Sequence, residues 1–354
     1  MSEHFLPQYA KFQRRKGLIL LVLCVLVLFL ALLGINAGAA SLNPVEVLRT
    51  LLGLGGRNAA LIIFHIRLPR VAAAIVAGAG LSVAGCVMQN NLKNPMASPQ
   101  TLGISNAAAF GANVAIIFLG AGSVTGSAAG AGVSIRAPYL VTGCAFVCAM
   151  AATLLILALS KHRGFSPETI VLAGVALGFL FNAGITLLQY FAQDTQLAAA
   201  VFWTFGDLGR VSWQEVGILT AVTAPALVYF TLRRWDYNAL DSGEDSAKGL
   251  GVNTGRTRFW GMLLSCLITA AAVSFLGMIG FVGLLGPQMM RRLVGPDHRW
   301  LLPASALAGA AILLAADTLG RVVLSPIVLP VGAVTSLLGA PMLLYLLMRG
   351  YSRK

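Results

Sequence analysis

The few charged residues within the apolar segments of this 354-residue chain are the first candidates for chemistry. Asp317 and Arg321 stand four residues apart, so a helix over this segment would place them on one face, where they can pair. Pairing lowers the cost of holding either charge near hydrocarbon. One interpretation is a structural ion pair at a helix end. The other is that Arg321 faces outward and joins Arg67 and Arg70 in a basic surface for a negatively charged partner.

Groups suited to catalysis or metal binding are few. Ser105, in the stretch GISN, resembles an intramembrane nucleophile, but the nearest candidate base, His65, falls on the opposite side in the predicted topology. The histidines do not cluster, and Cys144 and Cys148 have no histidine or carboxylate nearby to complete a metal site. No Walker A motif occurs, so the chain is not expected to hydrolyse ATP by that route. We therefore expect no catalytic residue, no cofactor and no metal site.

The elements that must position these residues are membrane helices. The chain is 58% hydrophobic and 10% charged, with a mean hydropathy of +0.83. Soluble domains are about half apolar and a quarter charged. Apolar runs of spanning length therefore predict an all-α polytopic membrane protein with ten spans. The predicted spans are residues 17–37, 70–90, 101–120, 138–160, 168–191, 213–232, 258–279, 281–294, 301–322 and 331–348.

The net charge of +13 is interpreted as a topology signal rather than as a sign of nucleic-acid binding. With ten spans, 18 of the 25 Lys and Arg residues fall on one side, which predicts that both termini are cytoplasmic and that residues 1–16 form a cytoplasmic tail. The basic run KFQRRK, the apolar run and the small residues AGAAS together imitate a cleavable signal. The many later spans favour a retained first helix instead.

Two loops on the predicted outer side differ in character. In residues 38–66, Ser41 or Asn43 before Pro44 predicts a capped short helix on the membrane surface. Residues 121–136 consist largely of Gly, Ala and Ser and predict a flexible connector.

The longest polar loop, residues 233–257, lies on the predicted cytoplasmic side. It carries the start, middle and end signals of a short helix, namely Asp241 and Ser242, Glu244 to Lys248, and Gly249 and Gly251. This order predicts short helices on the inner surface that offer a contact for a cytoplasmic protein. A merely solvated polar loop is the alternative.

Eight motifs, in order from about residue 60 to the C-terminus, together resemble those of the FecCD-type permeases. These permeases are the membrane subunits of ABC importers for ferric siderophores, cobalamin and haem. The motifs are RLPR at 67–70, NPMASPQTLGIS at 94–105, LAGVALG at 172–178, GE..A.GLGV at 243–252, GFVGL at 280–284, GPDHRWLLP at 295–303, AADTLGR at 315–321 and LPVGAVTSLLGAPMLLYLL at 329–347.

The resemblance implies one transmembrane permease domain over residues 1–354, of the type II ABC importer class. Spans two to five and seven to ten form two blocks that enter the membrane from opposite sides, so a repeat between them is expected to be inverted. Its implied partners are two ABC ATPase subunits, an extracytoplasmic binding protein and a second permease subunit, identical or not. The implied location is the cytoplasmic or inner membrane of a bacterial or archaeal cell, with no nucleic-acid partner. The expected cargo is an iron chelate, a ferric siderophore, and cobalamin or haem are the alternatives. An ion-coupled secondary transporter is disfavoured because carboxylates and histidines are scarce near the middle of the spans.

Three groups of site residues also follow from the resemblance. Arg67, Arg70 and Arg321 are similar to arginines that receive acidic residues of the binding protein. The loop at 233–257 is similar to the helices that couple the permease to its ATPase, with Ser242, Gly243, Glu244, Ala247, Leu250 and Gly251 as the coupling residues. The cytoplasmic gate corresponds to Ser166, Pro167, Glu168 and Thr169. One departure is Gln288, which stands where many relatives have a histidine, so a role that needs a titratable imidazole does not carry over.

Overall fold

The structure is a computed structural model that describes residues 5–38, 43–127, 130–135, 137–161, 165–325 and 327–351. Within this part of the chain, seven helices are long and apolar enough to cross a membrane, and two shorter apolar helices accompany them. All ten predicted spans coincide with helices, which confirms the polytopic helical fold. These helices are α1 (Phe5–Asn36), α4 (Leu68–Asn91), α5 (Ile104–Asn113), α6 (Pro138–Lys161), α7 (Pro167–Tyr190), α9 (Trp213–Leu232), α12 (Thr254–Leu276), α13 (Val282–Val294), α14 (His298–Val322) and α15 (Val331–Tyr351).

Helix α4 lies at the centre of the bundle, where it packs against α9, α12, α13 and α14. Its sequence is rich in Gly, Ala and Ser, so neighbouring backbones can approach it closely. Gly78 lies against Gly309 of α14, and Gly85 lies against Gly283 of α13. A side chain at either position of α4 would collide with a backbone carbonyl. These small residues therefore allow α13 and α14 to pack closely against α4.

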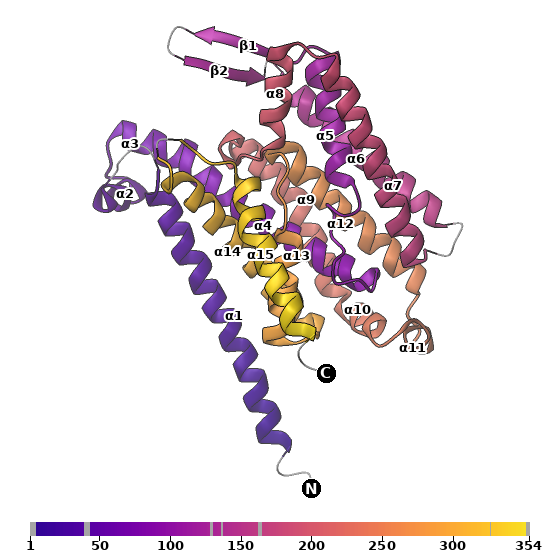
Figure 1. The fold of residues 1–354 in the computed structure, drawn as a ribbon. Coiled ribbons are helices and arrows are strands. Elements are labelled where there is room, and N and C mark those ends of the chain that lie inside the picture. Colours follow the sequence, from indigo (N-terminus) through magenta and orange to yellow (C-terminus); the bar gives the residue numbers. More distant parts are fainter. Residues whose placement is uncertain are drawn as a thin grey trace.

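Large apolar side chains are instead displayed on the outside of the bundle. The most apolar windows of α1 and α7 are each 17% buried, against 78% for the segment Arg57–Asn91 that contains α4. Leu28 of α1 and Phe179 of α7 are among the exposed residues. Lipid tails are as apolar as leucine, so a surface of this kind is expected in a bilayer. In Figure 1, α1 stands at the margin of the bundle.

The connecting elements gather at two opposite ends of the bundle (Figure 1). The hairpin end carries the strands β1 (Gly122–Ser127) and β2 (Gly130–Ile135) and the helices α2 (Pro44–Leu51), α3 (Arg57–Ile62) and α8 (Asp194–Thr204). The α10–α11 end carries α10 (Arg234–Asp241) and α11 (Glu244–Gly249), and α1 begins and α15 ends on the same side. A π-helical turn, Ile63–Arg67, joins α3 to α4, and another, Val114–Phe118, extends α5. A short 3-10 turn, Leu208–Arg210, precedes α9.

The structure confirms one of the two loop predictions, contradicts the other and shows that most of the predicted N-terminal tail is helical. The capped helix is present as α2, with the Asn43 side chain accepting a hydrogen bond from the Val45 amide at 3.1 Å, whereas Ser41 lies outside the described residues. The flexible connector predicted for residues 121–136 is wrong, because β1 and β2 pair there as an antiparallel hairpin. Its β-branched Val, Thr and Ile residues favour strands and outweigh the glycines. From Phe5 onward, the predicted tail is helical and belongs to α1.

Candidate functional site

At the hairpin end, one buried carboxylate joins two arginines from different helices. Asp317 of α14 accepts a hydrogen bond from Nε of Arg70 on α4 at 2.8 Å, and its other oxygen lies 3.0 Å from Nη2 of Arg321. The Asp317 side chain is 1% exposed. The predicted pair of Asp317 and Arg321 is therefore present, and Arg70 completes it. A second carboxylate, Asp207, lies 3.5 Å from Arg70 and is half-exposed.

Arg67, Arg70 and Arg321 form an arginine cluster at the hairpin end, and two of them hold the end of α1. Arg67 donates to the backbone carbonyls of Ile35 and Asn36 at 2.7 and 3.0 Å. Arg321 donates to the carbonyls of Gly34 and Ala37 at 2.9 and 2.6 Å. The last carbonyls of a helix have no partner within the helix and carry partial negative charge, so cations are favoured there. Arg67, in the π-helical turn before α4, and Arg321 of α14 thus attach the peripheral helix α1 to the core.

The structure brings the three predicted docking arginines together but does not expose them. Arg67, Arg70 and Arg321 are 4%, 8% and 7% exposed, so this chain alone does not present them as an open basic surface. The exposed arginines at this end include Arg49 of α2 and Arg57 of α3. The sequence could not distinguish the two sets, because it does not reveal which carbonyls need a donor.

At the opposite end, the predicted short helix forms as α11, and α10 precedes it. Gly243 and Gly251 flank α11 with φ of +117° and +83°, backbone conformations that favour glycine. Glu244 opens α11 and lies 3.0 Å from Nζ of Lys248. Its second oxygen lies 2.9 Å from Nη2 of Arg258, a buried residue of α12. Glu244 therefore attaches α11 to α12.

The predicted coupling residues divide into buried and exposed positions. Ala247 is fully buried and packs in the cluster that contains Tyr237 and Leu240 of α10. Leu250 is 72% exposed, and Ser242 is also exposed. Ala247 fixes the orientation of α11, while Leu250 and Ser242 are presented outward.

A polar network that the sequence did not predict holds α10 to the core. Asn90, at the end of α4, donates to the Tyr237 carbonyl at 3.1 Å and to Oδ1 of Asp241 at 2.6 Å. Asn238 of α10 accepts from the backbone amide of His298 at 2.8 Å, and its Oδ1 lies 2.9 Å from Nδ1 of the same histidine. Both links are to helices of the central bundle, α4 and α14. The polar run QNN at 89–91 was the available sequence signal.

Two carboxylates in this unit have shifted pKa values. Burial raises the pKa of Asp241 above its ordinary value, although Arg291 and the hydrogen bond from Asn90 act in the opposite sense. The hydrogen bond from Lys248 is the largest influence on Glu244, and with the contribution of Arg258 it holds the pKa of Glu244 below its ordinary value. Glu244 is therefore ionised at neutral pH and can keep both cations as partners.

The predicted gate residues form the start of α7. Ser166 is the N-cap, and its Oγ accepts from the Thr169 amide at 3.3 Å and lies 2.8 Å from the Thr169 hydroxyl. Pro167 takes the first helical position, and Glu168 is exposed in the first turn. These residue types and positions are those of a stable helix start.

An aromatic contact holds the start of α7 against α12. The ring of Phe165 packs edge-on against Phe259, with ring centres 5.8 Å apart. Phe259 directly follows Arg258, the residue that pairs with Glu244 of α11. The first turns of α12 are therefore in contact with both α11 and the segment that begins α7.

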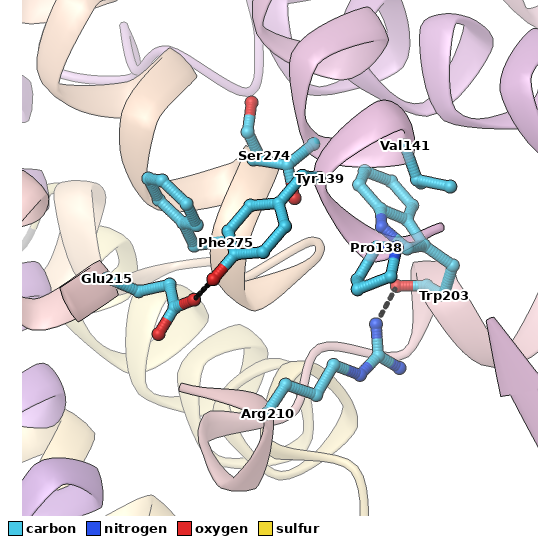
Figure 2. A pocket seen from close by; sticks show the side chains of 9 residues that line it. Pro138, Tyr139, Val141, Trp203, Arg210, Glu215, Ser274 and Phe275 are labelled. Atoms are coloured by element: carbon cyan, nitrogen blue, oxygen red, sulfur yellow. Dashed lines mark hydrogen bonds between the residues drawn. The ribbon is translucent and has the colours of Figure 1, made fainter. Parts of the chain in front are cut away.

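A small pocket at the hairpin end, shown in Figure 2, lies between the starts of α6 and α9 and the ends of α8 and α12. Tyr139 donates to Glu215 at 3.0 Å, and Arg210 donates to the Phe202 and Trp203 carbonyls. Its volume of about 130 Å³ is below the roughly 300 Å³ of the smallest usual ligand pockets. Its polar groups already serve helix ends, as Glu215 caps α9. This pocket is therefore a structural feature rather than a substrate site.

Gln288 of α13 contacts the loop that follows α4. Its Nε2 donates to the Pro95 carbonyl at 2.5 Å, a contact that needs an amide donor but no titratable group. Among the described residues, no three His, Cys, Asp or Glu side chains group as metal ligands would.

A bundle of long apolar helices with its connecting elements gathered at two opposite ends defines a multi-pass membrane protein. The chain belongs to the FecCD transport family, whose model matches residues 24–349. It is a permease of the metal-chelate, vitamin B12 or haem type of ABC transporter.

Individual relatives of this class match the chain over nearly their full length. A protein of Methanocaldococcus jannaschii named as a candidate ABC transporter permease is 50% identical over 98% of this chain and 99% of its own. The hemin transport permease of Yersinia pestis is 37% identical over 92% and 94%, and the Fe(3+)-citrate import permease of Bacillus subtilis is 36% identical over 95% and 96%. The inward-facing structure of a candidate metal-chelate type ABC transporter matches with a TM-score of 0.81 and 29% identity, over 94% of this chain and 99% of the other.

Proposed function

We propose that this chain imports an iron chelate, a ferric siderophore, as the permease of an ATP-driven importer. In this proposal it forms a dimer with a second permease subunit, identical or not. Two ATPase subunits bind the α10–α11 end, which faces the cytoplasm with both termini, and an extracytoplasmic binding protein delivers cargo to the hairpin end. The main support for this proposal is that specific polar contacts attach α10 and α11 to α4, α12 and α14. A solvated loop would have no need of them.

The mechanism follows the contacts of the α10–α11 unit. Closure of the ATPase subunits on ATP would push on exposed positions such as Leu250. The push would pass through Asn90 to α4, through Asn238 to α14 and through Glu244 to α12. Because Phe259 of α12 contacts Phe165, α12 would hold the start of α7 in the closed gate, and movement of α12 would release that segment and open the gate at Ser166 to Thr169.

Docking of the binding protein is proposed at the arginine cluster of the hairpin end. Since Arg67 and Arg321 are already bonded to α1 carbonyls, an acidic partner must compete with those carbonyls or with Asp317. Docking would then loosen the end of α1. Arg67→Gln should lower both the affinity for the binding protein and the thermal stability of the permease. Arg57→Gln, on the neighbouring exposed helix, is the matched control and should leave stability unchanged.

The deciding experiment places the permease in lipid vesicles with its ATPase and measures ATP hydrolysis and uptake. The binding protein is added empty or loaded with ferric siderophores, haem or cobalamin. We expect stimulation by a loaded siderophore form and ATP-dependent uptake of that cargo. Stimulation by haem or cobalamin alone would refute the siderophore assignment and establish the corresponding alternative. Uptake driven by an ion gradient without any ATPase would refute the importer proposal.

A further inference from the structure

A wide groove runs between α9 and α12 on the surface of the bundle and is not used by the proposed transport mechanism. Its volume is about 570 Å³, within the range of ligand sites. Most of its lining is apolar, including Pro225 of α9 and Leu264 of α12. Pro225 lies inside α9, where a proline removes a backbone hydrogen bond and favours a bend.

The polar lining of the groove is confined to one end. Arg233 follows the last residue of α9, and Arg256 lies in the first turn of α12, so both guanidinium groups belong to the α10–α11 end. Tyr229 and Trp260 line the groove beside them. Tyrosine and tryptophan are enriched where hydrocarbon meets water, and arginine extends its charge toward lipid phosphates from the same level.

The charges at this mouth leave an excess of positive charge. Nη1 of Arg233 lies 3.2 Å from the carboxylate of Asp236, and the Arg233 side chain remains 51% exposed. Arg256 is exposed, and Asn253 accepts a hydrogen bond from its backbone amide rather than from its guanidinium. The two guanidinium groups can bind a phosphate group between them, because the single carboxylate offsets only one of their two charges.

The length of the groove matches one leaflet of a bilayer. Its lining runs along α9 from Ala221 to Arg233, which at 1.5 Å per residue is about 18 Å. Half of a typical hydrocarbon core is about 15 Å. An acyl chain could therefore lie along Pro225 and Leu264 while its phosphate contacts the arginines.

We propose that the groove between α9 and α12 binds one anionic phospholipid from the leaflet at the α10–α11 end, with its phosphate held by Arg233 and Arg256. Basic pockets between membrane helices recognise acidic lipid headgroups in this way. The proposal needs only that the chain spans a membrane, so it stands apart from the assignments of ATPase, binding protein and cargo.

Trp260 provides a direct probe, because bromine atoms on lipid chains quench tryptophan fluorescence on contact. The purified full chain is placed, without any partner protein, in phosphatidylcholine bilayers that contain brominated phosphatidylglycerol or brominated phosphatidylcholine. The Trp260 contribution is the difference between the native chain and Trp260→Phe. We expect the phosphatidylglycerol form to reach half-maximal quenching at a several-fold lower mole fraction.

The charge variants identify the headgroup contacts. Arg233→Gln with Arg256→Gln should abolish this preference, and Arg256→Gln alone should reduce it. Arg234→Gln removes the adjacent arginine, which stacks on Trp235, and should leave the preference intact. Size-exclusion chromatography checks that each variant is folded.

Three outcomes would overturn the proposal. One is equal quenching of the Trp260 contribution by the two lipids, which requires only the conservative Trp260→Phe variant to fold. Another is a preference that survives in the folded double variant, since the charge would then act from elsewhere. The last is loss of phosphatidylglycerol quenching on addition of millimolar inorganic phosphate, which would indicate a site for free phosphate or another soluble anion.

Discussion

Arg70 and Asp317 are 247 positions apart in the sequence, yet they form a buried hydrogen-bonded ion pair at 2.8 Å. The pair joins α4, the central helix, to α14. Because Asp317 also pairs with Arg321, and Arg321 reaches the end of α1, one carboxylate organises three helices. Breaking a buried pair by removing one partner is far more costly than the net gain of forming it, because the other charge is left unpaired.

Asp317→Ala should therefore destabilise the protein strongly, by about 3–5 kcal/mol. Two guanidinium groups would lose their shared carboxylate inside the protein. Thermal unfolding in detergent measures the effect. Asp207→Asn is the control, because Asp207 is half-exposed, lies 3.5 Å from Arg70, and as Asn can still accept from the Gly209 amide. A cost under about 1 kcal/mol is expected there. Equal costs for the two variants would contradict the organising role of Asp317.

Glu244 should be required for coupling as well as for the position of α11. Glu244→Gln loses the charge that partners Arg258, which is 3% exposed, and should cost about 1–3 kcal/mol. Glu244→Arg places a cation against that arginine and should remove transport and cargo-stimulated ATP hydrolysis while the bundle remains folded. Thermal unfolding measures the stability cost of Glu244→Gln. Transport and cargo-stimulated ATP hydrolysis of Glu244→Arg are measured in vesicles with the ATPase. Asp245→Asn, one position later and exposed, is the control. Full coupled activity in Glu244→Arg would exclude the coupling role.

The stabilising effect of Glu244 should depend on pH in a defined direction. Since the pKa of this carboxyl is lowered in the folded protein, its contribution is present above the ordinary glutamate pKa of about 4.3 and is lost as pH falls through the lowered value. The difference in unfolding temperature between the native chain and Glu244→Gln should be constant from pH 7 to about pH 5 and shrink below pH 4. A difference that grows on acidification would have the wrong sign for this pair.

Local signals predicted the elements of this fold well, and long-range pairing was beyond them. Apolar runs predicted the positions of ten helices, seven of which are long and apolar enough to span a membrane among the described residues. Asn43 and Gly251 marked helix boundaries because capping depends on a few adjacent residues. The partners of Arg67 are backbone carbonyls 31 and 32 positions away, and no periodicity encodes them. The sequence alone favours an exposed position for a charge near a span end, whereas here the unpaired carbonyls at the end of α1 accept hydrogen bonds from buried arginines. The inverted repeat stays a prediction.

For the gate and the coupling helices too, local structure could be predicted from the sequence and long-range contacts could not. Ser166 was placed by resemblance, and its capping role follows from the adjacent sequence. The contact between Phe165 and Phe259 joins residues 94 positions apart by number and could not be anticipated from spacing. The network around Asn238 likewise depends on how α10 packs on the bundle, where Tyr237 and Leu240 are buried, and sequence spacing does not reveal that packing.

Asn238→Ala should weaken the link between α10 and α14. The variant removes the acceptor for the His298 amide and the donor to Asp297, leaving buried polar groups of α14 with fewer partners. We expect cargo-stimulated ATP hydrolysis to fall about tenfold while the ATPase still binds, as judged by co-purification. Asn58→Ala, exposed at the hairpin end, is the control. Unchanged stimulation would show that force does not pass through Asn238.

Phe165→Ala should weaken the closed gate. An aromatic pair of this geometry contributes about 0.5–1.5 kcal/mol, so its loss should raise the population of open gates by about two- to tenfold. The measurement is passive efflux of cargo from preloaded vesicles without ATP. Phe191→Ala is the control, because Phe191 follows the last residue of α7 and is 80% exposed. If α12 does hold the gate through this contact, Phe259→Ala should raise efflux to the same degree, and the double variant should add little. Additive increases would mean that the two rings act on efflux independently.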